Sequence, residues 1–127
     1  RIAYPGNKFS VADFVWVTEF HGYATELEVK TSMADWMLDL KKEKWRSGFP
    51  SCISRFIYVV PQELGIPSWA PQVAGVWHVT QELSIEVARE PQRLSKNPID
   101  KRLRDAWRSG FYLRYWEQRT ECLTHHA

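Results

Sequence analysis

The sequence predicts an α/β domain in which helices flank a mixed central β-sheet. Runs of β-branched and aromatic residues, each bounded by turn residues, alternate with segments whose apolar positions recur every three to four residues. The predicted order is strand, strand, strand, helix, strand, strand, helix, which is typical of a mixed sheet with helices packed on it. A length of 127 residues fits one domain, so residues 1–127 are treated as a single unit.

Three strands are predicted at the start of the chain. Residues 1–4 end a strand, and the Tyr-Pro-Gly-Asn segment 4–7 forms a turn, because proline fixes φ while Gly and Asn accept left-handed geometry. Residues 11–18 are β-branched and aromatic and predict the next strand. The His-Gly pair at 21–22 marks a connection, and residues 25–31 then alternate strictly between two kinds of side chain. The last two strands are therefore expected to form a hairpin.

A helix is predicted over residues 33–46. Ser32 is a suitable N-cap, and Asp35 lies three residues further on, where a carboxylate favours the helix start. Gly48 and Pro50 end the helix. Its apolar positions recur at helical spacing and predict one packed face: Met33, Trp36, Met37 and Leu40.

The second half of the chain predicts further strands and a terminal helix. Residues 56–60 form a continuous apolar run, which suits a strand buried on both faces. A proline-containing loop over 62–71 leads to a short strand at 74–79, and a weaker strand is predicted at 85–88. Residues 100–123 predict a helix, with one apolar side that carries Leu103, Trp107, Phe111 and Tyr115.

Composition sets only broad limits on function. The formal net charge of +2 permits a polyanionic partner without requiring one. Cys52 and Cys122 lie far apart and resemble neither a disulfide framework nor a zinc site, so we expect two reduced thiols. The four histidines show no metal-ligand spacing. We see no transmembrane-length apolar stretch and no signal peptide, so we expect an intracellular, cytoplasmic protein without a membrane partner.

The second strand of the predicted hairpin carries a group of charged residues. Because successive strand side chains point to opposite faces, Glu26, Glu28 and Lys30 share one face. The neighbouring strand contributes Asp13 within an otherwise apolar run. Charged groups are costly to bury unless they are paired or bind a metal. Two interpretations stay open for this group: ion pairing on a solvated face, which we favour for Glu26, or a functional site.

Phosphodiester hydrolysis is one chemistry that uses these residue types together. Two carboxylates such as Asp13 and Glu28 can hold Mg²⁺, a hard cation that takes oxygen ligands. A bound metal polarises a phosphate and lowers the pKa of water, while a nearby lysine stabilises negative charge or orients the nucleophile. Residues 28 and 30 lie ~7 Å apart along the strand, which leaves space for one hydrated metal ion.

Several short motifs follow one another in order between roughly residue 11 and residue 79. They are Glu28-Val29-Lys30-Thr31-Ser32, Ala34-Asp35-Trp36, Asp39, the lysines that lead to Trp45, the strand 56–60 with Pro61, Glu63-Leu64-Gly65, and Ala74-Gly75-Val76. Together they resemble the MmcB-like DNA repair family of the PD-(D/E)xK nuclease superfamily. The specificity of this likeness comes from the number of motifs rather than from any one of them.

This resemblance implies a restriction-endonuclease-like core and a Mg²⁺- or Mn²⁺-dependent endonuclease that cuts DNA, in repair or mobile-element processing. By position, Asp13 corresponds to the first metal aspartate, Glu28 to the second acidic ligand and Lys30 to the catalytic lysine. The carbonyl of Val29 often completes the metal shell in such sites. Ala12 stands where the family motif has proline. The superfamily core also begins with a helix, so we expect this domain to lack it or to replace it with another segment.

Phosphate contacts are expected around this centre. We expect DNA-binding roles for Lys8, Ser32, Lys41 and Lys42, although a basic run on a helix is also typical of a solvated face. DNA is the expected partner, and a homodimer is an open option because many such enzymes cut both strands as dimers. The alternative functions are a non-catalytic DNA-binding or scaffold domain with the same fold, and a protein-interaction module.

Overall fold

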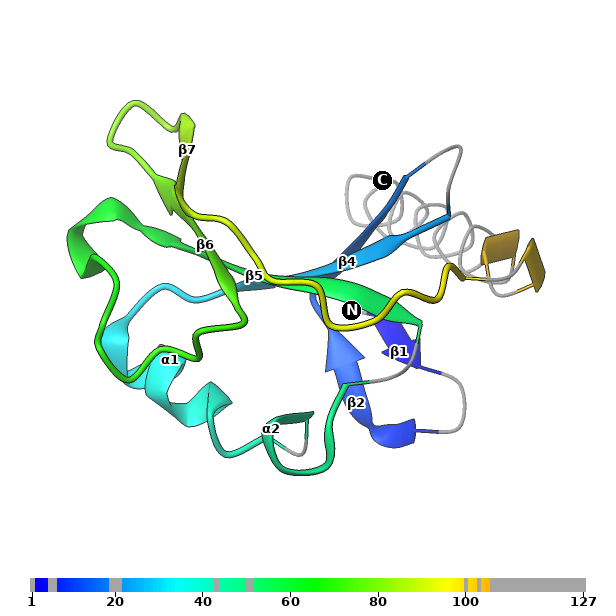
Figure 1. Ribbon diagram of the computed structural model, residues 1–127. Coiled ribbons are helices and arrows are strands. Elements are labelled where there is room, and N and C mark those ends of the chain that lie inside the picture. Colours follow the sequence, from blue (N-terminus) through cyan, green and yellow to red (C-terminus); the bar gives the residue numbers. More distant parts are fainter. Residues whose placement is uncertain are drawn as a thin grey trace, which may run out of the picture.

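The computed structural model places a curved sheet at the centre of the molecule, with α-helices on one side (Figure 1). The structure describes residues 2–4, 7–18, 22–42, 44–49, 52–99, 101–102 and 104–105. Within these ranges, side chains are described from residue 13 onward, except that of Ser47.

Between residues 2 and 89, the described chain forms seven strands and three short helices. The strands are β1 (Ile2–Tyr4), β2 (Asn7–Ala12), β3 (Phe14–Val17), β4 (Ala24–Val29), β5 (Ile53–Pro61), β6 (Gly75–Val79) and β7 (Ile85–Arg89). The helices are α1 (Met33–Asp39), α2 (Lys44–Ser47) and the 3₁₀ helix η1 (Gln62–Leu64).

Five of the strands form one mixed sheet in the order β3-β4-β5-β6-β7. The three central strands, β4, β5 and β6, run parallel, and the edge strands β3 and β7 pair antiparallel with their neighbours. β1 and β2 form a separate antiparallel pair. A mixed sheet with helices confirms the α/β class that the element order predicts.

The main core lies between the sheet and the connections that cross its helix-covered face. β5 is buried on both faces, as its continuous apolar run predicts. Phe56, Tyr58 and Val60 of β5 pack against Trp36 of α1. Since β4–β5 and β5–β6 are parallel pairs, each connection must cross over the sheet. The connection through α1 and α2 lies on one side of the sheet (Figure 1). From it, Lys42 and Lys44 reach Glu28 of β4.

The opposite face of the sheet is apolar and more open. Phe14 and Trp16 on β3 and Val87 on β7 are each more than half exposed. The rings of Trp16 and Trp77 approach to 6.5 Å between centroids across this face. The two faces therefore differ in chemistry: buried charges lie on the helix side of β4, and exposed apolar side chains lie on the other side.

Two predicted elements are interrupted. The strand expected at 11–18 is broken by a bend at Asp13, where the side chain accepts a hydrogen bond from Val29. The helix expected at 33–46 stops after Asp39. Residues 40–42 bond back only three positions instead of four, which tightens the chain and ends the α-helical ladder before α2 begins. Both predictions were wrong as single elements, and both breaks occur at charged side chains.

The chain after β7 returns toward the start of β4. The amide of Ile99 donates to the carbonyl of Gly22 at 2.7 Å, and the Ile99 side chain is buried against Ala24 and Ile53. Gly22 has a φ of 66° and a Cβ there would lie 3.3 Å from the Ile99 carbonyl oxygen, so the position favours glycine. Of the helix predicted at 100–123, residues 101–102 and 104–105 are helical, and the remainder lies outside the described residues.

Two further expectations concern the chain as a whole. Cys52 is half-buried and Cys122 lies outside the described residues, so the expectation of two reduced thiols stays a prediction. Among the residues that the structure describes, no helix has both the length and the apolar character that crossing a membrane requires.

Candidate active site

The structure brings Asp13 and Glu28 together. Asp13 lies at the bend just before β3, and the β3–β4 register places it opposite Glu28. Its Oδ2 accepts a hydrogen bond from the Val29 amide at 3.1 Å, and its carboxyl group is hydrogen-bonded to that of Glu28. A hydrogen bond between two carboxyl groups requires a proton on one of them. The pair predicted from adjacent strands therefore shares one site.

Glu28 is buried and surrounded by lysines. Its side chain is 1% exposed, and its Oε2 lies 3.9 Å from the Lys30 ammonium and 3.7 Å from that of Lys42. Lys44 lies 4.0 Å from Oε1. Burial raises the pKa of Glu28 to about 7, against the opposing effect of Lys44 and with a further rise from the hydrogen bond to Asp13. Glu28 thus binds a proton near neutral pH.

Lys30 projects from the end of β4 into the same cluster. Its amide donates to the Val59 carbonyl at 3.0 Å, which fixes the backbone where the strand ends. The side chain is 8% exposed, and its ammonium lies 3.9 Å from Asp35 and 3.5 Å from Asp39. Alternation along the strand predicted that Glu28 and Lys30 share a face. In the structure, the Lys30 ammonium and the Glu28 carboxyl oxygen lie 3.9 Å apart.

Asp39, at the end of α1, is the centre of the cluster. It is fully buried, and its carboxylate lies 2.8 Å from the Lys42 ammonium and 3.2 Å from that of Lys44. The Tyr58 hydroxyl donates to its Oδ2 at 2.5 Å, and the Trp45 indole donates at 3.3 Å. Burial opposes ionisation, but Lys44, Lys42 and Tyr58 together hold the pKa of Asp39 well below its usual range. Burial and the Asp39 carboxylate in turn raise the pKa of Tyr58.

Asp39 and Lys44 were not predicted as members of the site. Asp39 entered only as one position of the family resemblance, and Lys44 as part of a basic run. A regular helix through residue 46 would have placed Lys42 on the same face as Asp39 but turned Lys44, five residues on, away from it. With the break at residues 40–42, both Lys42 and Lys44 reach Asp39. The detectable signal was the density of opposite charges at 39–44.

The remaining predicted residues have varied positions. Glu26 is 1% exposed, so the expectation of a solvent-exposed pairing role was wrong: it lies on the same helix-covered face as Glu28. Ser32 is the N-cap of α1, and its Oγ accepts from the Asp35 amide at 3.1 Å, as predicted. Lys41 is exposed. Lys8 belongs to β2, and its side chain lies outside the described part.

The donor set suits a small divalent cation. Asp13 and Glu28 supply two carboxylates, and Val29, whose carbonyl is the third expected ligand, follows Glu28 directly in the chain. Within the described residues, no group of three or more His, Cys, Asp or Glu side chains is arranged to hold a metal ion. Mg²⁺ is commonly held by one or two carboxylates, with water and phosphate oxygens as its other ligands. The Glu28 Oε1 atom is buried without a hydrogen-bond partner, which fits a position reserved for a cation.

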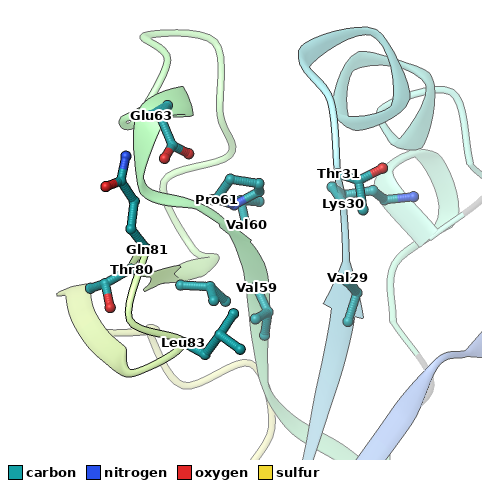
Figure 2. Close-up of a pocket in the computed structure, with 11 residues that line it drawn as sticks. Val29, Lys30, Thr31, Val59, Val60, Pro61, Glu63, Thr80, Gln81 and Leu83 are labelled. Carbon is teal, nitrogen blue, oxygen red and sulfur yellow. The ribbon is translucent and has the colours of Figure 1, made fainter.

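A pocket of about 350 Å³ adjoins this cluster at the carboxyl end of the parallel strands (Figure 2). It begins at Val29 and Lys30, where β4 and β5 diverge. Figure 2 shows the Lys30 ammonium directed away from the pocket, so the strand end separates the charged cluster from a mainly apolar cavity. The lining residues are Val29, Lys30, Thr31, Val59, Val60, Pro61, Glu63, Val79, Thr80, Gln81 and Leu83.

Comparison with known proteins adds a likeness in fold. No protein-family model matches the sequence, and no curated protein matches it. Among solved structures, the chain is similar to the SPO1766 protein of unknown function from Silicibacter pomeroyi, with a TM-score of 0.57 and 19% sequence identity. The match covers 84% of this chain and 66% of that one, so the chain spans just under two thirds of its neighbour's length. This neighbour places the chain among α/β proteins with a shared fold.

Proposed function

We propose that this protein is a metal-dependent nuclease of the PD-(D/E)xK type, which hydrolyses DNA phosphodiester bonds on a restriction-endonuclease-like core. The observation that carries the proposal is the meeting of Asp13, Glu28 and Lys30 at the end of β4. The buried Glu28 carboxyl group is hydrogen-bonded to the partly exposed Asp13 carboxyl group, and the Lys30 ammonium lies 3.9 Å from Glu28. Two carboxyl groups with a lysine beside them are the residue types that metal-assisted phosphodiester hydrolysis uses.

In this proposal, Asp13, Glu28 and the Val29 carbonyl hold Mg²⁺ or Mn²⁺. The ion supplies Lewis acidity toward a phosphate oxygen and lowers the pKa of water. Glu28 must lose its proton to act as a ligand. The lysines that lie within 4.0 Å of Glu28 are close enough to contact a phosphate bound to such an ion.

Lys30 acts on the reacting phosphate in this arrangement. Its ammonium is held from two sides by Glu28 and Asp39, and its side chain is 8% exposed. Little side-chain entropy remains to be lost when it meets the substrate. A fixed cation in a poorly hydrated site stabilises developing negative charge more than a mobile surface lysine does. Lys30 therefore stabilises the transition-state charge or orients the attacking water.

Phosphates beyond the reacting one meet the basic residues nearby. Lys42 is 37% exposed and faces both the cluster and solvent, while Lys41 is exposed beside it. Together with Ser32 and Lys8, they would give a salt-dependent affinity that carries no sequence information. DNA repair and mobile-element processing are the biological settings that suit such an activity.

Nicking of supercoiled DNA tests the proposal. The wild-type protein should nick with Mg²⁺ or Mn²⁺ and not with a chelator. Asp13→Ala and Lys30→Ala should each reduce the rate by at least about a hundredfold, within the range typical for loss of one electrostatic or acid–base group. Lys96→Ala, which removes an exposed lysine away from the cluster, serves as the matched control. Full activity in both site variants would reject the assignment.

A non-catalytic DNA-binding or scaffold role is the second candidate. The observation that favours it is the set of three lysine ammonium groups that lie within 4.0 Å of Glu28 and surround its carboxyl group without a metal. Calorimetry with Mn²⁺ separates the two candidates. A binding signal that Asp13→Ala abolishes supports the nuclease, whereas DNA binding with no Mn²⁺ signal supports the scaffold.

A further inference from the structure

The pocket beside Lys30 lies on the opposite side of the sheet from the charged cluster. Val29, Val59 and Trp77 occupy paired positions on β4, β5 and β6, and paired residues of a parallel sheet point to the same side. Val79 lies two residues beyond Trp77 and points the same way. Val29, Val59 and Val79 therefore form one apolar wall, and Lys30 leaves β4 toward the other face.

The mouth of this pocket is formed by a strained leucine. Leu83 is the sole non-glycine residue with positive φ, at 62°, in the part of the chain that the structure describes. Glycine or asparagine adopts this geometry more readily, so leucine here costs free energy. Leu83 is also 83% exposed, which means that its own packing does not repay the strain. Strain that persists in this way is often found at ligand-binding positions.

The turn that carries Leu83 is held rigidly. The Thr80 amide donates to the Ser84 carbonyl, and the Leu83 amide donates to the Thr80 carbonyl, each at 2.9 Å. The Thr80 and Ser84 hydroxyls lie 2.7 Å apart. Figure 2 shows the Leu83 side chain extending toward Val59 across the pocket. The turn thus presents an apolar side chain at a fixed position opposite the strand wall.

Polar groups at the rim restrict the chemistry of the occupant. Thr31, Glu63 and Gln81 are exposed at the edge of the pocket and offer hydrogen-bond donors and acceptors. The Glu63 carboxylate disfavours a phosphate, and apolar walls disfavour any charged group. A flat, neutral ring with polar edges fits both conditions. The volume of about 350 Å³ lies at the lower end of the range for small-molecule pockets, roughly 300–1,000 Å³.

We propose that this pocket binds an unpaired nucleobase of the strand whose phosphate lies at Lys30. This inference rests on the proposed function. Val29 and Lys30 belong both to the candidate active site and to the pocket, and Val79 lies two strand spacings, ~10 Å, from β4. A base attached to a nucleotide at Lys30 could reach across the strand end. The base would contact Val59 and Leu83, as bases taken out of a stack contact apolar side chains in pockets.

Binding of single-stranded oligonucleotides in the absence of divalent metal tests this proposal. Two probes of equal length carry the same phosphates, one with bases and one made of abasic residues. The wild-type protein should bind the base-containing probe about five- to tenfold more tightly, as expected if roughly 40–55 Å² of apolar surface is removed from water at ~25 cal/mol per Å². Leu83→Gly should bring this ratio close to one without weakening the abasic probe. Leu83→Asn, which also tolerates the backbone geometry, should do the same.

Val87→Ala, on the same hairpin and outside the pocket, is the matched control and should keep the wild-type ratio. Thermal unfolding should show both Leu83 variants to be at least as stable as the wild type, because the strain is relieved. A wild-type ratio of one, or an unchanged ratio in both Leu83 variants, would overturn the pocket assignment. The outcome is independent of cleavage. A protein that binds the base-containing probe selectively but never nicks DNA would contradict the proposed nuclease activity and support the proposed base-binding pocket.

Discussion

The Lys42 ammonium lies 2.8 Å from the carboxylate of Asp39, which is three positions earlier in the chain, at the end of the α-helix. The pair is stabilised because Lys44 and Tyr58 contact the same carboxylate from other directions. Asp39 is therefore the point at which the lysines of the site are held in place. Its loss should affect the whole cluster.

Asp39→Asn should destabilise the protein by about 3 kcal/mol, because removing one partner of a buried ionic network leaves the others uncompensated. Chemical denaturation at pH 7 measures this effect. Asp35→Asn is the matched control, since Asp35 also lies near Lys30, at 3.9 Å, but is about half exposed. Asp35→Asn should lower the free energy of unfolding by less than about 1 kcal/mol. Equal effects of the two substitutions would contradict the central role of Asp39.

Tyr58→Phe removes only the hydroxyl that donates to Asp39. The ring remains packed between Trp36 and Phe56, whose centroids lie 5.3 and 4.7 Å away. A hydrogen bond to a charged acceptor contributes roughly 1.5–3 kcal/mol, so unfolding free energy should fall by about 2 kcal/mol. Denaturation with an unchanged m-value checks that the native packing is kept. A stability within 0.5 kcal/mol, roughly the spread of neutral surface substitutions, would show that the bond is unimportant.

Lys41 and Lys42 are neighbours in sequence but differ in surroundings, which separates two kinds of DNA contact. Lys42→Ala should reduce nicking by at least about tenfold, because it removes a cation 3.7 Å from Glu28. Lys41→Ala should leave the rate at saturating DNA unchanged and weaken DNA binding only modestly. Rates at several DNA concentrations distinguish the two effects. Equal losses in both variants would place the phosphate on the outer surface of the helix instead.

The fold was predictable where side-chain periodicity was simple. The alternation at 25–31 and the apolar run at 56–60 correspond to β4 and β5, and these two strands form the centre of the sheet. The interruptions at Asp13 and after Asp39 were not predictable from propensity. In each case, a charged side chain makes tertiary contacts that outweigh local helix or strand preference.

The site was predictable in part for the same reason. Strand alternation was enough to put Glu28 and Lys30 on one face, and the hairpin brought Asp13 beside them. The sequence of β4 alone does not show which of its faces is buried, because the apolar face is also suited to burial. The residues that cover the charged face belong to α1 and to the segment around Asp39, which come to lie over β4 only when the chain crosses the sheet.

Glu28 predicts an unusual dependence of stability on pH. Its pKa rises on folding from the model-peptide value of 4.5 to about 7. Below pH 4.5 it is protonated in both states and contributes no difference. Between pH 4.5 and 7 the unfolded chain releases the proton first, so stability falls as pH rises, by on the order of 3 kcal/mol in total. The lowered pKa of Asp39 acts the other way, but only in more acidic solution, where stability is lost as its carboxylate is protonated.

Glu28→Gln should therefore remove this loss, since the amide does not titrate. Wild-type and variant proteins should have similar stabilities at pH 5, and the variant should be the more stable at pH 8. Other titrating groups are common to both proteins and cancel in the difference. Chemical denaturation at pH 5, 6, 7 and 8 measures this difference in the free energy of unfolding between the two proteins. Mn²⁺ should reverse the order at pH 8 by binding only the wild type. At pH 5, where Glu28 of the folded protein is protonated, Mn²⁺ binding should release about one proton per ion. A difference between the two proteins that stays constant from pH 5 to pH 8 would show that Glu28 keeps its ordinary pKa in the folded protein.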